Sequence, residues 1–143
     1  MPNTGASDFA GQDAGEIVVS VDAMGGDRGP GAVVAGIALA AAELPQLRIV
    51  LHGPESVLSP LVAKRPVLAG RVALRHAERV VAMTDKPGQV MRNGEGTSMW
   101  SAIEAVKRAE ATAAVSCGNT GALMALSTIR LRRLPGINRP AIA

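Results

Sequence analysis

The sequence predicts an α/β protein built around a mainly parallel sheet, and three observations support this class. Short runs rich in Val, Ile and Leu recur along the chain and alternate with Ala-rich stretches of helical character. Two of these short runs end in glycine clusters that lead directly into a helix. Aromatic residues make up only 1% of the chain, so the core must be built from aliphatic side chains. Strands that alternate with helices favour a parallel sheet covered on both faces.

The first strand–helix unit follows a polar, glycine-rich stretch at residues 1–15, which we expect to be a disordered tail. Residues 16–23 (EIVVSVDA) have the β-branched composition of a buried strand. Pro30 suits the first turn of a helix, because its missing N–H would have no partner there. Residues 31–43 are Ala-rich and predict a helix that ends before Pro45.

The second unit repeats this plan with a shorter helix. Residues 47–51 (LRIVL) predict a strand, and a His-Gly-Pro turn follows it. Residues 55–64 predict a helix that is closed by Pro66. Residues 71–74 then predict a third strand.

A long polar segment at residues 80–96 interrupts the alternation. It contains two turn signals, DKPG at 85–88 and NGEG at 93–96, with room for one short helix over 87–92. Loops of this length are uncommon inside compact domains and are often functional. We therefore expect this segment to contribute to a binding site.

The alternation resumes in the last third of the chain. Residues 98–110 predict a helix capped by Ser or Thr, and residues 113–116 (AAVS) predict the next strand. The turn Gly118–Gly121 leads into a helix expected over 122–133. Residues 138–143 have the character of an approach to a further strand.

Composition limits the classes of function that are open. The 143 residues fit one domain or part of a larger one, and the net charge is +3. That charge fits an anionic substrate, an acidic protein partner or an anionic membrane surface, and it equally fits an ordinary surface with extra arginines. One Phe, one Trp and no Tyr leave no stacking platform for single-stranded nucleic acid.

Cysteine usage and hydropathy point to a cytoplasmic protein. The lone Cys117 cannot form an internal disulfide, and the N-terminus lacks the basic-then-apolar pattern of a signal peptide. The longest apolar run, residues 33–42, is well short of the roughly 20 residues needed to span a bilayer.

Two strand–glycine turn–helix junctions, Asp22–Pro30 and Ser116–Gly121, are candidate anion sites. Ligands bind at the carboxyl ends of parallel strands, where free amides and a helix N-terminus favour phosphate. Asn119 and Thr120 add uncharged hydrogen-bonding groups. Each junction alone is a weak signal, because neither matches a dinucleotide or P-loop fingerprint and either turn can simply reverse the chain.

Charged residues near these turns are candidates for the same site. Lys86 and Arg92, in the long polar segment, can donate to phosphate or to an acidic partner. Asp27, in the first turn, can orient a base or a lysine, or simply cap the helix that follows.

The remaining reactive side chains favour structural interpretations. His52 and His76 stand far apart in sequence and match no nucleophile or metal spacing. Cys117 lies at a strand end before a helix, where a thiolate would be stabilised, but a small buried apolar role is the more common one. The absence of a Cys/His cluster in the sequence gives no indication of a zinc site.

Several motifs in one order resemble the PlsX family of bacterial phosphate acyltransferases. The resemblance covers residues 17–143 and includes two longer signatures. The motifs are Val21–Asp27 followed by Gly29-Pro30, Asp85–Pro87, Ser98-Met99, Ser116–Ala125, and Leu134–Ile137 followed by Arg139-Pro140. Cys117 stands where the family commonly has a small apolar residue, which favours an inert thiol.

The resemblance implies an enzyme that transfers a fatty acyl group from acyl carrier protein to inorganic phosphate and so makes acyl phosphate for phospholipid synthesis. It also implies a three-layer α/β/α sandwich similar to phosphate acetyltransferases and isocitrate dehydrogenases, with residues 16–143 as the N-terminal part of a single domain. Members are cytoplasmic homodimers that associate loosely with the inner face of the membrane. Neither a metal nor a cofactor is implied.

The residues that the resemblance and the two turns single out fall into two groups. The candidate catalytic residues are Lys86, Asp27 and Asn119. The candidate phosphate- or substrate-binding residues are Gly25, Gly26, Arg92, Ser98, Gly118, Thr120 and Gly121. The sequence is less than half the usual family length, so a truncated α/β module that binds phosphate or nucleotide without turnover is the alternative. A nicotinamide oxidoreductase is disfavoured, because the fingerprint and its acidic residue are missing.

Overall fold

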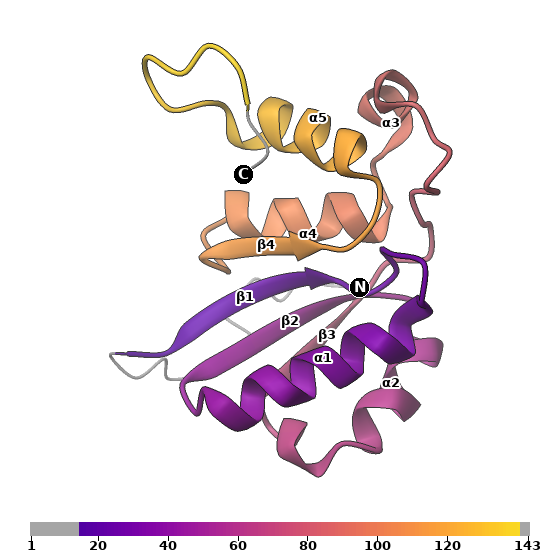
Figure 1. Ribbon diagram of the computed structural model, residues 1–143, viewed down its shortest axis with the longest axis vertical. Coiled ribbons are helices and arrows are strands. Elements are labelled where there is room, and N and C mark those ends of the chain that lie inside the picture. Colours follow the sequence, from indigo (N-terminus) through magenta and orange to yellow (C-terminus); the bar gives the residue numbers. More distant parts are fainter. Residues whose placement is uncertain (1–14, 141–143) are drawn as a thin grey trace.

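The computed structural model describes residues 15–140, and its centre is a four-stranded sheet in which every neighbouring pair is parallel. The strand order is β3-β2-β1-β4, so the first strand of the chain lies inside the sheet and β4 lies at its edge (Figure 1). Helices cover both faces of the sheet, as in a three-layer α/β/α sandwich. The predicted α/β class is therefore confirmed.

The elements alternate along the chain as the sequence predicts. The first half contains β1 (Ile17–Asp22), α1 (Gly29–Glu43), β2 (Leu47–Gly53), α2 (Glu55–Ala63), a 3-10 turn (Pro66–Leu68) and β3 (Val72–His76). The second half contains α3 (Pro87–Asn93), α4 (Ser98–Lys107), β4 (Ala113–Ser116) and α5 (Thr120–Leu131).

Most boundaries differ from the prediction by one or two residues, and larger differences have identifiable causes. β2 extends to Gly53 because His52 and Gly53 pair with the end of β3. α4 stops at Lys107, three residues early, since Ala109 takes a positive φ of 58° that a helix does not allow. Residues 138–140 form no strand, and the rest of the strand expected at 138–143 lies outside the described residues, as does the expected tail at 1–14.

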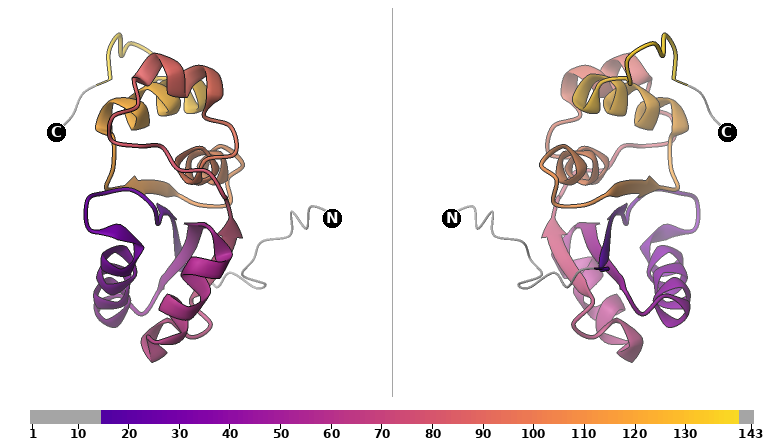
Figure 2. Two further views of the ribbon diagram at one scale, coloured as in Figure 1. Left: turned by 90° about the vertical axis from the view of Figure 1, so that its right-hand side faces the viewer. Right: turned by 90° about the vertical axis from the view of Figure 1, so that its left-hand side faces the viewer.

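The two faces of the sheet carry different helices. α1 and α2 cover one face, and α4 lies on the opposite face against β1, β2 and β4 (Figures 1 and 2). α5 packs on α3 and α4 and not on the sheet, so it forms an outer layer on that side.

Alternation along the strands divides the core between these faces. Val21, Ile49 and Leu51 face α1 and α2, whereas Val18 and Val50 face α4. A third cluster lies away from the sheet, between α3, α4 and α5. It contains Val81, Val90, Met99, Ile103, Ala122 and Leu126.

A buried polar network attaches α4 to the sheet. The Ser20 hydroxyl donates to the Ala102 carbonyl (2.8 Å), so it accepts from His52 Nε2–H (2.8 Å). His52 Nδ1 then accepts from the Ser101 hydroxyl (2.7 Å), which defines a neutral tautomer. Burial, together with the charge of Arg75, lowers the pKa of His52 to about 3. His52 is therefore a structural histidine.

A surface contact joins the outer helix to α4. Arg130 of α5 forms an ion pair with Glu104 of α4 and stands over the Trp100 ring, 4.6 Å from its centroid. The hydrogen bond from Arg130 lowers the pKa of Glu104 below its usual value. Among residues 15–140, no helix is both long enough and apolar enough to cross a membrane.

Candidate functional site at the ends of two adjacent strands

The carboxyl ends of β1 and β4 lie side by side, and their last residues are in register. Asp22 pairs with Ser116 across the two strands. The Ser116 hydroxyl donates to Asp22 Oδ2 (2.9 Å), and the Met24 N–H donates to Asp22 Oδ1 (3.0 Å). Asp22 is only 2% exposed, and its Oδ2 joins the two strand ends while its Oδ1 shapes the first turn.

The two glycine-rich turns pack against each other so closely that side chains would not fit. A Cβ on Gly25 would lie 2.7 Å from Ser116 Oγ and 2.8 Å from the Gly118 nitrogen. A Cβ on Gly118 would lie 2.6 Å from the Gly26 nitrogen. Gly26 also adopts a φ of +96°, which favours glycine. Contact between the turns thus accounts for these glycines independently of any ligand.

Asn119 joins the second turn to the long polar segment. It caps α5 by accepting the Ala122 N–H on Oδ1 (3.1 Å), with its own backbone in the left-handed region at φ 38°. Its Nδ2 donates to the carbonyls of Ala82 and Asp85, both at 2.8 Å. Both amide hydrogens of the side chain are therefore engaged within the protein.

This docking brings Lys86 beside the start of α5. Pro87, the first residue of α3, lies so close that a Cβ on Gly121 would be 3.0 Å from Pro87 Cγ. The Lys86 N–H donates to Gln89 Oε1 (3.4 Å), which fixes the start of α3. The Lys86 side chain is exposed to solvent. The Lys86 backbone therefore lies near the N-terminus of α5, where the helix dipole favours anions.

The accessible part of the site comes from three segments. Asp27 in the first turn and Thr120 and Gly121 at the start of α5 are exposed, as is Cys117 between the strand end and Gly118. α1 begins from Arg28 without a side-chain cap, so the alternative that Asp27 caps this helix is wrong.

Two predicted site residues lie apart from this surface. Arg92 is in the last turn of α3, about 7.5 Å along the helix from Pro87. Ser98 is fully buried at the start of α4, where its N–H donates to the Arg79 carbonyl (2.9 Å). Within the described chain its hydroxyl is buried without a hydrogen-bond partner. Contact between Ser98 and a substrate would require the protein to open there.

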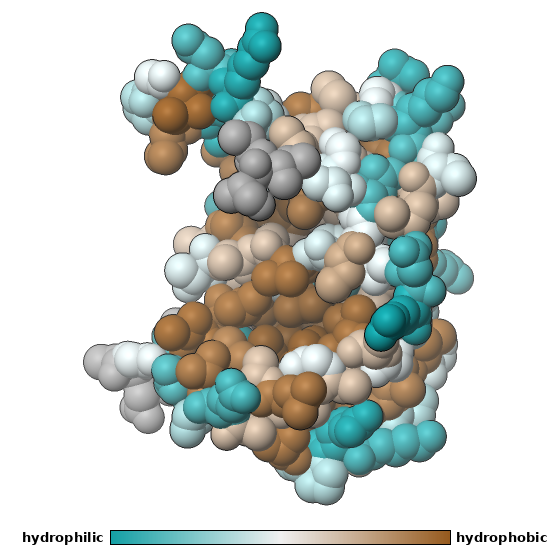
Figure 3. All heavy atoms as spheres, viewed as in Figure 1, coloured by the Kyte–Doolittle hydropathy of each residue, from teal (hydrophilic) through white to brown (hydrophobic). Residues whose placement is uncertain are grey.

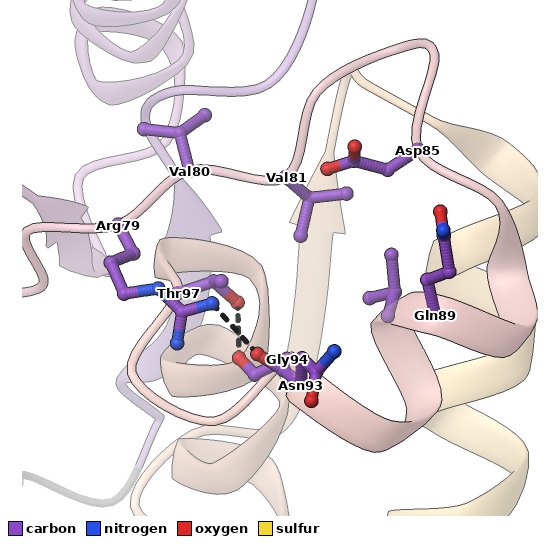
Figure 4. Close-up of a pocket in the computed structure, with 9 residues that line it drawn as sticks. Arg79, Val80, Val81, Asp85, Gln89, Asn93, Gly94 and Thr97 are labelled. Carbon is purple, nitrogen blue, oxygen red and sulfur yellow. Dashed lines mark hydrogen bonds between the residues drawn. The ribbon is translucent and has the colours of Figure 1, made fainter.

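A small pocket borders the site between α3 and the segment before it (Figure 4). Its volume is about 250 Å³. Arg79 spans one wall by donating to the carbonyls of Asn93 (2.9 Å) and Glu95 (2.8 Å). Asp85 and Gln89 lie on the opposite side (Figure 4). Arg79 thus joins the two arms of the long polar segment.

Sequence reasoning missed Arg79 as a part of this region, and it named Ser116 as the start of the second junction without giving it a role. Ser116 had a detectable signal, because Asp22 and Ser116 each stand at the end of a glycine-free strand and directly before a glycine turn. Arg79 had none, since its partners are backbone carbonyls that only the tertiary structure brings near. Residues 15–140 contain no group of three or more His, Cys, Asp and Glu side chains placed to hold a metal ion.

Comparison with known proteins gives consistent matches. Residues 17–143 match the profile of a family described as fatty acid synthesis protein. A phosphate acyltransferase from Cereibacter sphaeroides is 66% identical over 135 residues, which cover 94% of this chain and 36% of that protein. Phosphate acyltransferases from Ruegeria pomeroyi (62%, covering 98% and 38%) and Paracoccus denitrificans (63%, covering 92% and 35%) are also similar. The chain spans little more than a third of these relatives.

Proposed function

Because the chain belongs to the fatty acid synthesis protein family, we propose that its full-length protein is a phosphate acyltransferase of phospholipid synthesis. It would transfer a fatty acyl group from the thioester of acyl carrier protein to inorganic phosphate. The observation that carries this proposal is the match to phosphate acyltransferases, and the exposed start of α5 at Thr120 and Gly121, close to Lys86, supports it. Such an arrangement suits an anion.

The reaction requires phosphate to be positioned against the thioester and its negative charge to be compensated. A phosphate oxygen attacks the thioester carbonyl carbon, the C–S bond breaks, and the proton of hydrogen phosphate passes to the leaving sulfur. The products are acyl phosphate and the free thiol of the carrier. Holding phosphate in line with the carbonyl supplies much of the acceleration, and donors aimed at the developing oxyanion supply more.

Residue roles follow from their places around the turns. Gly25, Gly26, Gly118 and the start of α5 at Thr120 and Gly121 would surround the phosphate, because these backbones meet at the strand ends. Lys86 would compensate the charge of phosphate. Asp27 would orient that lysine from the first turn.

Asn119 would act by fixing the site, since its side chain caps α5 and holds the Ala82 and Asp85 carbonyls. Arg92 would add positive charge at longer range. Ser98 would contribute only after α4 and the segment before it separate, because its hydroxyl is buried.

The test is acyl phosphate formation by the full-length protein from an acyl carrier protein thioester and phosphate. The Lys86→Met variant should lose about 10²-fold in kcat/KM, as expected when one donor to the reacting charge is removed. Lys64→Met, an equal change at an exposed residue after α2, is the matched control. Wild-type protein without acyl phosphate formation would overturn the proposal, and equal activity of both variants would remove Lys86 from it.

The second candidate is a module that binds phosphate or nucleotide without turnover, favoured by the exposed start of α5 at Thr120 and Gly121. It predicts that both the chain of 143 residues and the longer protein bind phosphate or nucleotide while neither forms acyl phosphate. Parallel assays of both chains separate these cases.

The location and partners of the full-length protein form part of the same proposal. Acyl carrier protein is acidic, and the net charge of +3 suits such a partner. By resemblance to its family, the protein would be a cytoplasmic homodimer in peripheral contact with the inner face of the membrane.

A further inference from the structure

The long polar segment at residues 80–96 brings Lys86 near the start of α5, and the packing of α3 alone does not fix it there. A pocket of about 250 Å³ separates α3 from the arm that precedes it (Figure 4). α3 buries Val90, which belongs to the same cluster as Ala122 and Leu126 of α5. One buried side chain holds the middle of a helix but leaves its ends free to turn. The position of Lys86 therefore depends on what holds the two ends of α3.

The start of α3 is held by Asn119. Its Nδ2 donates to the carbonyls of Ala82 and Asp85, both at 2.8 Å. The same side chain caps α5 through the Ala122 N–H (3.1 Å). Asn119 therefore ties the residues just before Lys86 to the start of α5.

The end of α3 is held by Arg79, whose guanidinium reaches two carbonyls at once. Nη2 donates to the carbonyl of Asn93, the last residue of α3 (2.9 Å), and Nη1 donates to the carbonyl of Glu95 (2.8 Å) (Figure 4). The last carbonyls of a helix have no partner within it. Gly94, which follows α3, has a φ of −74°, so no left-handed glycine closes the helix at this position. Arg79 supplies the cap instead.

The backbone of Arg79 is itself fixed to the body of the protein. Its carbonyl accepts the Ser98 N–H at the start of α4 (2.9 Å), and Arg79 forms a parallel bridge with Thr97. α4 in turn packs on β1, β2 and β4. The Arg79 side chain thus connects the free end of α3 to the helix that lies against the sheet.

We propose that Arg79 is a positioning residue, which keeps Lys86 near the N-terminus of α5 by capping the opposite end of α3. The seven residues of α3 span about 10 Å, so a turn of this helix about Val90 would move Lys86 away from Thr120 and Gly121. Loss of the cap would lower the fraction of protein with Lys86 in place, and the apparent affinity for phosphate would fall by the same factor. This inference rests on the proposed function, because it takes Lys86 as the cation that compensates phosphate.

The first test is the kinetics of acyl phosphate formation by the full-length protein. Arg79→Lys keeps the charge, but a single ammonium does not reproduce the planar fork over two carbonyls; Arg79→Gln removes the charge as well. Both variants should raise the KM for phosphate about 5–10-fold and change kcat by less than about twofold, because bound phosphate draws Lys86 back into place. Arg65→Lys and Arg65→Gln, at an exposed arginine beyond the end of α2, are the matched controls.

Three results of these kinetics would overturn the proposal. An unchanged KM for phosphate in both Arg79 variants would remove Arg79 from the site. A wild-type KM in Arg79→Lys would show that charge alone matters. A raised KM for acyl carrier protein, with that for phosphate unchanged, would make Arg79 a contact for the acidic carrier. Because Arg79 is exposed, its loss strands no buried group, and the urea midpoints of all variants should match that of the wild type.

A double-mutant cycle tests whether Arg79 acts through Lys86. In the Lys86→Met background, Arg79→Gln should cause no further rise in the KM for phosphate, because the residue that it positions is already gone. An equal rise in both backgrounds would show that Arg79 acts independently of Lys86, and the proposal would be wrong.

Hydrogen exchange tests the cap without relying on the reaction. In ligand-free full-length protein, the amides of residues 90–93 should exchange at least about 5-fold faster in Arg79→Lys than in Arg65→Lys, because α3 opens more often. Equal exchange would overturn the proposal. Wild-type protein that forms no acyl phosphate would overturn the proposed function instead, and the exchange rates would still decide whether Arg79 holds α3.

Discussion

At the scale of single residues, His52 shows how burial decides a chemical role. Its ring lies wholly inside the protein, with both nitrogens satisfied by serine hydroxyls. Protonation of the ring would remove its one acceptor nitrogen and would place a positive charge in a buried apolar layer. The residue therefore fixes α4 to the sheet and is unsuited to acid–base catalysis.

This burial predicts a pH dependence of stability. The folded pKa of about 3 lies below the unfolded value of about 6.5, so between them the unfolded state binds more protons. Stability from this residue is complete above pH 6.5 and falls as the pH decreases, by about 2 kcal/mol at pH 5. Urea unfolding of the full-length protein at pH 7.5 and 5.0 measures it.

The His52→Gln variant is the control for this experiment. Gln retains hydrogen-bonding groups but does not titrate, so the loss between the two pH values should shrink by the histidine contribution. An unchanged pH dependence in this variant would contradict the assignment.

The contact between the two glycine turns makes a second prediction. Gly118→Ala should destabilise the full-length protein by about 1–3 kcal/mol, because its Cβ would meet backbone atoms of Gly25 and Gly26. Gly31→Ala, inside α1 with nothing within 4 Å, should keep or raise stability. Denaturant midpoints measure both, and equal effects would show that the turns do not pack as described.

At the scale of elements, α4 depends on its cap as well as on its buried face. Thr97 is buried, accepts the Trp100 N–H (3.2 Å) and donates to the Gly94 carbonyl (2.7 Å). The same side chain therefore starts the helix and closes the preceding turn. α4 in turn supports His52, Ser20 and the outer helix α5.

Removing the Thr97 cap should therefore lower the stability of the protein. Thr97→Ala should lower the free energy of unfolding by about 1–2 kcal/mol, whereas Thr97→Ser, which keeps the hydroxyl, should lose much less. Thermal unfolding followed by circular dichroism compares them. A loss of equal size in both variants would assign the effect to the methyl group and not to the cap.

Sequence patterns located these elements well where a local signal existed. The strands at 16–23 and 113–116 and the short helix at 87–92 were each predicted within about two residues. The early end of α4 at Lys107 was missed, because a positive φ at an alanine has no sequence signature.

At the scale of the whole molecule, the main feature is that helices cover the two faces of the sheet unequally. The side of the sheet that carries α4 is packed, while an apolar hollow of about 650 Å³ beside α1 and the β4 edge carry exposed apolar groups (Figure 3). Large exposed apolar patches usually mark an interface or an aggregation site. These exposed apolar surfaces should therefore govern how the isolated chain behaves in solution.

We therefore predict that the chain of 143 residues self-associates when it is expressed alone. Light scattering after size exclusion should show mass that rises with concentration. Val115→Lys should reduce this by placing a charge on the sheet edge. Leu39→Lys, equally charged but on an exposed part of α1, should have less effect. A wild-type monomer with a sharp cooperative melt would contradict the prediction.

The sequence by itself determined the α/β class, the order of elements and the two glycine turns. These depend on local composition and on hydrophobic periodicity, which act over a few residues. It also singled out Lys86 and Asn119, which the structure brings into one region through the hydrogen bonds of Asn119 to the Ala82 and Asp85 carbonyls.

Only the tertiary structure decided how those pieces meet. The strand order brings Asp22 to Ser116 across 94 residues and packs Gly25 against Gly118. It also buries Ser98 and uses both amide hydrogens of Asn119 inside the protein. Such contacts join residues far apart in the chain, so no local pattern encodes them. Their geometry arises only when the parallel strands align.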